Sequence, residues 1–204
     1  DVIRAEVFRR GMESITTEMA VTLQRTSGSP VVTEGMDFST SLLDTEIEQI
    51  AFSGYVAFHV STSFLGVECV MRNYTLDEIQ PGDGFLINDP YSAGAIHQGD
   101  VAVVMPYFYD GEIVGWGHID EHVLDVGGSA VSGFAPEARD CFSEALRFPG
   151  VRAIRFGELD REWRRFIEKN VRVPDPVLND IRSMIAAHHT GQDRLSRLID
   201  EYGL

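Results

Sequence analysis

The run Val101-Ala-Val-Val-Met-Pro-Tyr-Phe-Tyr109 is followed at once by Asp110-Gly111 and then by Ile113-Val-Gly-Trp116. Two apolar, β-prone runs on either side of Asp-Gly are typical of a β-hairpin, because this dipeptide readily adopts the positive φ angles of a tight turn. The short apolar run Phe85-Leu-Ile87 precedes the hairpin and predicts a buried strand. We therefore expect a sheet built around this hairpin, with antiparallel pairing.

Amphipathic helices are predicted before and after the hairpin, because apolar residues recur there at three- and four-residue steps. The helical segments are residues 2–25, 59–74, 160–171 and 177 to the C-terminus. Two β-rich segments, 31–33 and 39–43, predict a strand pair between the first two helices. The fold class is thus α+β (mixed α/β), with amphipathic helices packed on a mainly antiparallel sheet that has a central β-hairpin.

The length of the chain allows one sizeable domain. Its 204 residues, 44% of them hydrophobic, can bury a substantial core. We expect a single domain, or a fragment of one, over residues 1–204: a helix/strand/helix lead-in at 1–80, the hairpin at 81–128 and a mainly helical part at 129–204. The chain starts at Asp1 without a methionine and enters a helical pattern at once, which predicts a portion of a longer polypeptide.

The charge balance limits the possible partners. With 17 basic and 32 acidic side chains the net charge is -15, which repels a phosphate backbone and anionic lipid head groups. We therefore expect neither nucleic-acid nor membrane partners. The sequence shows neither an apolar run long enough for a membrane span nor a signal pattern, and the two cysteines are too few for a disulfide framework. These features predict a cytoplasmic protein.

Two His-x-x-Asp pairs, His97/Asp100 and His122/Asp125, lie on either side of the hairpin. Asp100 is ten residues before Asp110, and His122 is eleven residues after Gly111, so a regular ladder places them nearly opposite each other. Two imidazoles and two carboxylates form a mixed nitrogen and oxygen ligand set that suits Zn²⁺, Mn²⁺ or Fe²⁺ better than Ca²⁺ or Mg²⁺. The spacing predicts a divalent-metal site.

The other polar candidates leave alternatives open. By strand alternation His118 shares a face with His122 and is either a reserve ligand or a structural hydrogen-bonding residue. Asp37, at the start of an expected strand, is either a turn or capping residue or a functional one, and His59 caps or packs a helix. The adjacent pair His188-His189 makes a poor chelate on a helix, and we expect it to be solvated.

Several motifs together resemble one family. They are Gly82-Asp-Gly-Phe-Leu-Ile-Asn-Asp-Pro-Tyr91, His97-x-x-Asp100, Pro106-x-Phe-x-Asp-Gly111 and His122-x-x-Asp125-Val-Gly-Gly128. In this order they resemble the hydantoinase B/oxoprolinase family. The resemblance also includes Arg25-Thr-Ser-x-Ser-Pro30, Asp37-Phe-Ser39, His59 and Glu144-Ala-Leu-Arg-Phe-Pro149, and so extends over essentially the whole chain.

The resemblance implies a function. Members of this family are metal-associated subunits or halves of ATP-dependent enzymes that open lactams, hydantoins or 5-oxoproline, or that carboxylate acetone or acetophenone. It implies that a hydantoinase A-type subunit or domain binds ATP and activates a small-molecule substrate. It also implies that the metal ligands are found among the positions that match the family's polar motifs, which are Asp37, His97, Asp100, His122 and Asp125.

Three functional hypotheses follow from these features. The first is a subunit of an enzyme that hydrolyses a cyclic amide with ATP. The alternative is a subunit of an ATP-dependent ketone carboxylase, because the motif Ile96-His-Gln-x-Asp100 is closer to that branch. The chain also departs from the family where Val123 stands in place of a frequent second histidine. The remaining hypothesis is a non-catalytic assembly module with inert histidines.

Overall fold

A computed structural model describes residues 2–54, 56–131 and 134–203 of the chain. Within these residues, seven strands form one antiparallel sheet in the order β2-β1-β5-β4-β3-β6-β7. The strands are β1 Phe38–Leu43, β2 Gln49–Gly54, β3 Gly84–Ile87, β4 Asp100–Tyr109, β5 Glu112–His122, β6 Pro149–Arg155 and β7 Glu158–Leu159. The helices are α1 Val2–Thr26, α2 Pro30–Thr33, α3 Ala57–Asn73, α4 Cys141–Glu144, α5 Arg161–Asn170 and α6 Pro174–Tyr202, with a 3-10 turn at Leu76–Glu78. The α+β prediction is confirmed.

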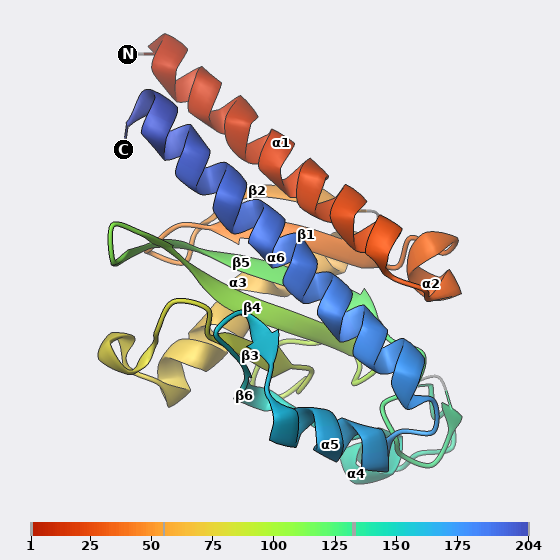
Figure 1. Cartoon of the computed structure of the whole chain (residues 1–204). Coiled ribbons are helices and arrows are strands. Elements are labelled where there is room, and N and C mark those ends of the chain that lie inside the picture. The colour runs from red at the N-terminus through yellow and green to blue at the C-terminus, as the bar shows by residue number, and fades with distance from the viewer. Residues whose placement is uncertain (1, 55, 132–133, 204) are drawn as a thin grey trace.

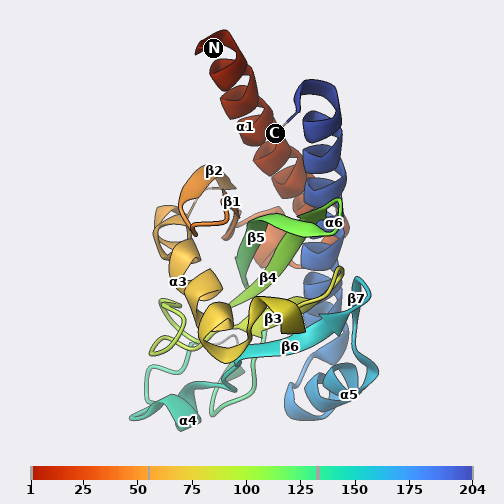
Figure 2. The same cartoon turned by 90° about the vertical axis from the view of Figure 1, so that its left-hand side faces the viewer.

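Helices cover both faces of the sheet. The two long helices α1 and α6 lie side by side along one face, and their outer ends bring the two chain termini near each other (Figure 1). Helix α3 covers the opposite face, as the turned view in Figure 2 shows. The sheet therefore has two buried faces, and each has its own cluster of apolar side chains.

The central hairpin forms as predicted. Strands β4 and β5 pair so that Asp100 lies opposite His122. The turn residues Asp110 and Gly111 have φ angles of 50° and 87°, which are the positive values that this short turn requires. The register therefore brings the two halves of the predicted site to one end of the hairpin.

Two secondary-structure predictions were wrong. The segment 31–33 lies in helix α2 rather than in a strand, because the Ser29 side chain accepts a hydrogen bond from the backbone N–H of Val31 and Pro30 occupies the first helical turn. Strands β6 and β7 were not predicted, and β6 pairs with β3, which lies far away in the sequence. Residues 132–133 lie outside the described residues.

Among the helices of the described residues, none combines the length and the apolar character that a membrane span needs.

Candidate metal centre

Three side chains meet at the end of the central hairpin. Asp100 begins β4 and His122 ends β5, while His97 lies in the loop that leads into β4. The Oδ1 atom of Asp100 is 3.1 Å from Nε2 of His97 and 3.3 Å from Nδ1 of His122. One potential ligand atom from each of the three residues lies within 4.8 Å of the other two. This compact group could hold a single metal ion.

A glycine allows the two imidazoles to approach each other. A Cβ atom at Gly99 would lie 2.6 Å from Cε1 of both His97 and His122, which is too close for any larger residue. The ring centroids of the two histidines are 5.0 Å apart. Gly99, between His97 and Asp100, therefore leaves the space that the two imidazole rings occupy.

A third histidine reaches the same carboxylate from the opposite side. His59 lies in the first turn of α3, and its Nε2 is 3.2 Å from Oδ2 of Asp100. Both side chains are only 2% exposed. His59 was expected to cap or pack a helix, and the local pattern around it gave no sign of the site. Its proximity to Asp100 depends on how α3 packs across the sheet.

The distances in the cluster suit metal ligands. Charge-assisted hydrogen bonds between an imidazolium and a carboxylate are about 2.7–2.9 Å long. Neighbouring ligand atoms around an ion with bonds of roughly 2.1 Å are instead about 3.0–3.4 Å apart, depending on octahedral or tetrahedral geometry. The separations of 3.1 Å and 3.3 Å around Oδ1 of Asp100 fit this ligand spacing, and they also lie near the upper end of the range for ordinary N–H···O hydrogen bonds.

The charges inside the cluster support each other. Burial alone would raise the pKa of Asp100, but the hydrogen bonds of the surrounding histidines hold it far below its usual value. Burial likewise opposes protonation of His59, yet the nearby carboxylates of Asp120 and Asp100 outweigh it and raise the pKa of His59 to about 9. Asp100 is therefore ionised at neutral pH, as a metal ligand must be.

A buried polar strip continues from the cluster beneath α3. Every second residue of β5 shares one face of the sheet, so His118 and Asp120 lie on the same face as His122. His118 is opposite Ser41 of β1, and Asp120 is opposite Ser39. Burial raises the pKa of Asp120 to about 6, and it lowers that of His118 to about 3. His118 packs so closely on α3 that a Cβ at Gly66 would be 2.8 Å from its Cδ2. His118 shares the face of His122, but it lies four residue pairs away from it along the β4–β5 ladder.

The two remaining aspartates differ in position. The backbone oxygen of Asp37 accepts a hydrogen bond of 3.1 Å from the backbone N–H of His122, so Asp37 lies beside the cluster. The carboxylate of Asp125 is fully buried and is bound by Arg172, whose Nη1 is 2.9 Å from its Oδ1. The backbone N–H of Arg172 also donates to Asp125. The structure thus brings Asp37 toward the other predicted ligands and pairs Asp125 with a guanidinium.

The histidines of α6 lie outside the centre. His189 is exposed, as expected. The expectation that His188 is solvated was wrong, because this residue is 1% exposed and faces the core between the sheet and α6. Its Nε2 is 3.0 Å from the backbone oxygen of Val103, and its Nδ1 is 3.1 Å from the hydroxyl of Tyr107. Burial lowers the pKa of His188 to about 3, so it is a neutral core residue.

The cluster opens to solvent on one side. A cavity of about 520 Å³ is lined by His97, Phe134, Ala135, Pro136 and Glu144. His97 is the exposed member of the cluster, with 23% of its side chain accessible, compared with 4% for His122. The ring of Phe134 stacks on both imidazoles, with centroid distances of 4.7 Å and 4.9 Å. A small molecule would reach the centre from this side.

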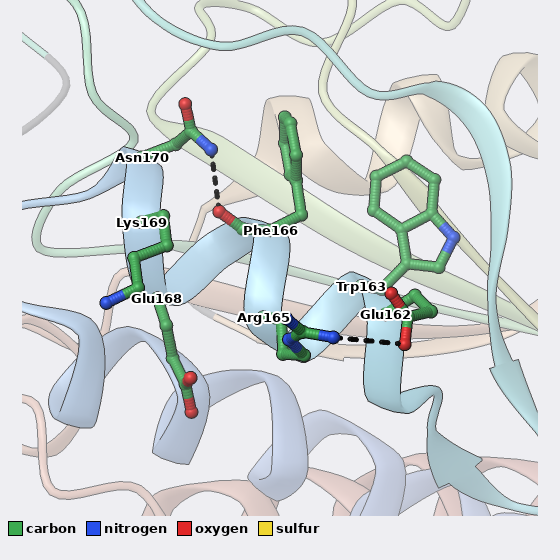
Figure 3. Close-up of a pocket in the computed structure, with 7 residues that line it drawn as sticks. All are labelled: Glu162, Trp163, Arg165, Phe166, Glu168, Lys169 and Asn170. Atoms are coloured by element: carbon green, nitrogen blue, oxygen red, sulfur yellow. Dashed lines mark hydrogen bonds and ion pairs between the residues drawn. The ribbon is translucent and has the colours of Figure 1, made fainter.

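A larger cavity, of about 570 Å³, lies along α5 and away from the cluster. Figure 3 shows its lining, where Trp163 and Phe166 stand among charged side chains such as Arg165 and Glu162. These two charged groups pair with each other at 3.6 Å. None of the lining residues belongs to the histidine and aspartate group, so the cavity beside His97 is the better candidate for chemistry.

Comparison with protein families assigns the chain. The model of the hydantoinase B/oxoprolinase family matches residues 1–204. The chain belongs to this family, as its motifs predicted.

Individual relatives give the assignment more detail. The chain is 32% identical to an uncharacterised protein of Methanocaldococcus jannaschii, over 100% of this chain and 36% of the relative. It is 31% identical to the beta subunit of the caprolactamase of Pseudomonas jessenii, over 100% of this chain and 35% of the relative. The chain thus spans about a third of the length of these relatives.

Solved structures agree with the fold. The crystal structure of the ATP-dependent caprolactamase from Pseudomonas jessenii matches with a TM-score of 0.89 and 30% identity, over 100% of this chain and 35% of that chain. A nucleotide-free acetone carboxylase matches with a TM-score of 0.90 over 100% of this chain and 27% of that chain, but at 20% identity it shows the fold alone.

Proposed function

We propose that His97, Asp100 and His122 bind a divalent metal ion, Zn²⁺, Mn²⁺ or Fe²⁺, and that Asp37 is the candidate for a fourth ligand. The observation that carries this proposal is the compact group of one carboxylate and two imidazoles at the end of the hairpin. Its mixed nitrogen and oxygen donors suit these three metals. Asp125 takes no part in this proposal as a ligand, because Arg172 already neutralises its carboxylate.

The reaction that we propose is the hydrolysis of a cyclic amide after ATP-dependent activation by a hydantoinase A-type subunit or domain. A bound metal of this kind would polarise a carbonyl group and acidify water, which contributes several kcal/mol at a transition state. His97 and Phe134 would line the entry for the substrate, and the buried His59 would hold Asp100 in place. The rest of the longer protein and its partner would supply the remaining parts of the active site.

The names of related proteins support this choice of reaction. The relatives include the beta subunit of a caprolactamase, a subunit of a putative D-/L-hydantoinase from a Pseudomonas species, and 5-oxoprolinases. These names share the opening of a cyclic amide, and the first two denote a subunit. The identities of 28–31% to these proteins support a related substrate class for this chain.

Metal analysis after extensive dialysis tests the site. We expect about one equivalent of metal per full-length chain in the wild type, and almost none in the His97→Ala, His122→Ala double variant. His189→Ala is the matched control, because this exposed histidine lies outside the cluster. Equal metal content in the wild type and the double variant would rule out the site.

A product assay tests the reaction. The full-length protein with its ATP-binding partner is incubated with ATP and a lactam, a hydantoin or 5-oxoproline, and separately with acetone and bicarbonate. We expect ring opening that needs ATP but not bicarbonate. Carboxylation of the ketone would replace the proposed reaction by the carboxylase alternative, and failure of every substrate would favour the assembly module.

A further inference from the structure

The carboxylate of Glu144 lies at the opening of the metal centre, and we propose that it is the catalytic acid and base of the reaction there. This inference rests on the proposed function and deepens it. Glu144 lines the cavity of about 520 Å³ together with His97. Asp100 is enclosed by histidines, and Asp120 is only 4% exposed, so neither carboxylate has the access to this cavity that Glu144 has.

The chain binds Glu144 directly to the loop that carries the cluster. The backbone N–H of Gln98 donates a hydrogen bond of 3.2 Å to Oε1 of Glu144. Gln98 is the neighbour of His97 and lies two residues before Asp100. The bond engages one carboxylate oxygen, which leaves Oε2 for a molecule in the cavity.

Buried amide side chains make this connection rigid. The fully buried side chain of Gln98 donates from Nε2 to the backbone oxygen of Ala145 at 2.7 Å. The equally buried Asn88 donates from Nδ2 to the backbone oxygens of Gln98 at 2.8 Å and Leu146 at 2.9 Å. The loop before β4 and the segment after α4 are therefore fixed relative to each other. A carboxylate held in this way has the positional precision that acid–base catalysis needs.

The proposed role of Glu144 is to accept and return one proton at the cavity beside His97. As the oxygen of a water molecule forms a bond to the carbonyl carbon of the activated ring, an O–H bond of that water breaks, and its proton moves to Oε2 of Glu144. When the ring C–N bond then breaks, Glu144 returns this proton to the departing nitrogen. This step adds one water across the C–N bond and leaves Glu144 as it began: one hydrogen reaches the nitrogen through Glu144, and the other comes from the hydroxyl of the intermediate as the C–N bond breaks. The phosphoryl group from ATP that activates the ring stays on the other acyl oxygen, and a second water cleaves this acyl phosphate to carboxylate and phosphate.

The test compares Glu144→Gln with Glu137→Gln in the full-length protein with its partner, assayed on the substrate that the wild type opens. Glutamine keeps the oxygen that accepts from the Gln98 backbone, whereas Glu137 is an exposed carboxylate that does not line the cavity. For Glu144→Gln we expect metal affinity within about threefold of wild type, because Glu144 is not a ligand. We expect kcat to fall by about 10²–10⁴-fold.

A second variant separates a chemical from a structural role. In Glu144→Ala the cavity gains room for a small carboxylate, so added formate should restore a measurable part of kcat. Formate should not affect Glu137→Gln, which we expect to behave as wild type.

Three outcomes would overturn the inference: kcat of Glu144→Gln within tenfold of wild type, loss of metal from that variant, or a low kcat in Glu144→Ala that formate does not raise. A wild type that binds no metal or opens no ring would instead contradict the proposed function itself.

Discussion

Asp100 and Asp125 are both buried, but different cations face them. Asp100 is approached by imidazole nitrogens on both of its oxygens, whereas Asp125 is bound by the guanidinium of Arg172. An imidazole can release its proton and bind a metal, but a guanidinium stays charged at any physiological pH. The first arrangement can therefore accept a metal ion, and the second is already neutralised.

Replacement of Arg172 by alanine tests the structural role of this pair. Because the variant leaves the buried carboxylate of Asp125 without its partner, we expect a loss of stability of about 2–3 kcal/mol, below the range for fully buried pairs since Arg172 is 42% exposed. Urea denaturation measures this loss. Metal content should not change in Arg172→Ala or in Asp125→Asn. Loss of metal from Asp125→Asn would make Asp125 a ligand after all.

Replacement of His59 tests its role behind Asp100. His59 supports the Asp100 oxygen that faces away from His97 and His122. Partners of this kind orient a ligand, and their removal typically weakens metal binding 10–100-fold. We expect His59→Ala to weaken metal affinity by that factor in calorimetric titrations, with His189→Ala as the unchanged control. An unaltered affinity would show that His59 does not orient Asp100.

Sequence spacing could predict one part of this cluster and not the other. Asp100 and His122 are related by counting outward from one tight turn, which is local information. His59 meets Asp100 through the packing of α3 on the sheet, which no short pattern records. For the same reason the burial of His188 escaped prediction, since adjacent helical histidines look alike in sequence although one faces the core.

The link between β5 and α4 depends on a pair of glycines. Gly127 and Gly128 have φ angles of 76° and 72°, and a Cβ at Gly128 would overlap the backbone oxygen of Glu144. This close approach helps to place Glu144, at the end of α4, in the lining of the cavity beside His97. The Gly-Gly pair is thus part of the framework that positions Glu144.

Replacement of Gly128 by alanine tests this link. The left-handed backbone alone costs a residue with a side chain about 1–3 kcal/mol, and the clash with Glu144 adds to it. We expect Gly128→Ala to lower the thermal midpoint by several degrees and to reduce kcat, because Glu144 must shift. Calorimetry and the ring-opening assay measure the two effects. Gly111→Ala, where a Cβ meets nothing within 4 Å, is the control for backbone strain without a clash. Equal effects of the two substitutions would contradict this account.

The strands that were missed or wrongly assigned also have physical explanations. Local capping by Ser29 and the fixed φ of Pro30 outweigh the β-propensity of Val31-Val32-Thr33. Strand β6 pairs with β3, which lies about sixty residues earlier in the sequence. The hairpin was predictable because turn and strands are contiguous, whereas pairing between distant strands depends on the packed molecule.

The two faces of the sheet bury different polar groups. The α3 face carries the cluster of His97, Asp100 and His122, while the face toward α1 and α6 buries Glu121 and Asp180, each 0% exposed. Asp180 accepts a hydrogen bond of 2.7 Å from the hydroxyl of Ser27, which joins α6 to the end of α1. Burial raises the pKa of Asp180 to about 6, although this hydrogen bond opposes the shift. Glu121 has its pKa raised well above its usual value, also by burial and then by the charge of Asp180.

The raised pKa of Asp180 predicts that the stability of the fold depends on pH. The folded state binds more protons than the unfolded chain between about pH 4 and 6, so the contribution of Asp180 to stability declines as pH rises through that window. Asp180→Asn keeps an oxygen for Ser27 and removes the charge. We expect it to raise the thermal midpoint by several degrees at pH 8 and by almost nothing at pH 4. An exposed-site variant, Glu112→Gln, should show no such pattern, and a lower midpoint for Asp180→Asn at pH 8 would contradict the prediction.

The metal centre itself is tested most directly by anomalous scattering from crystals of the full-length protein grown with Zn²⁺, Mn²⁺ or Fe²⁺. We predict one strong peak about 2.0–2.3 Å from an imidazole nitrogen of His97, an imidazole nitrogen of His122 and Oδ1 of Asp100. No peak at this position with any of the three metals, or a peak held at Asp125 instead, would contradict the account.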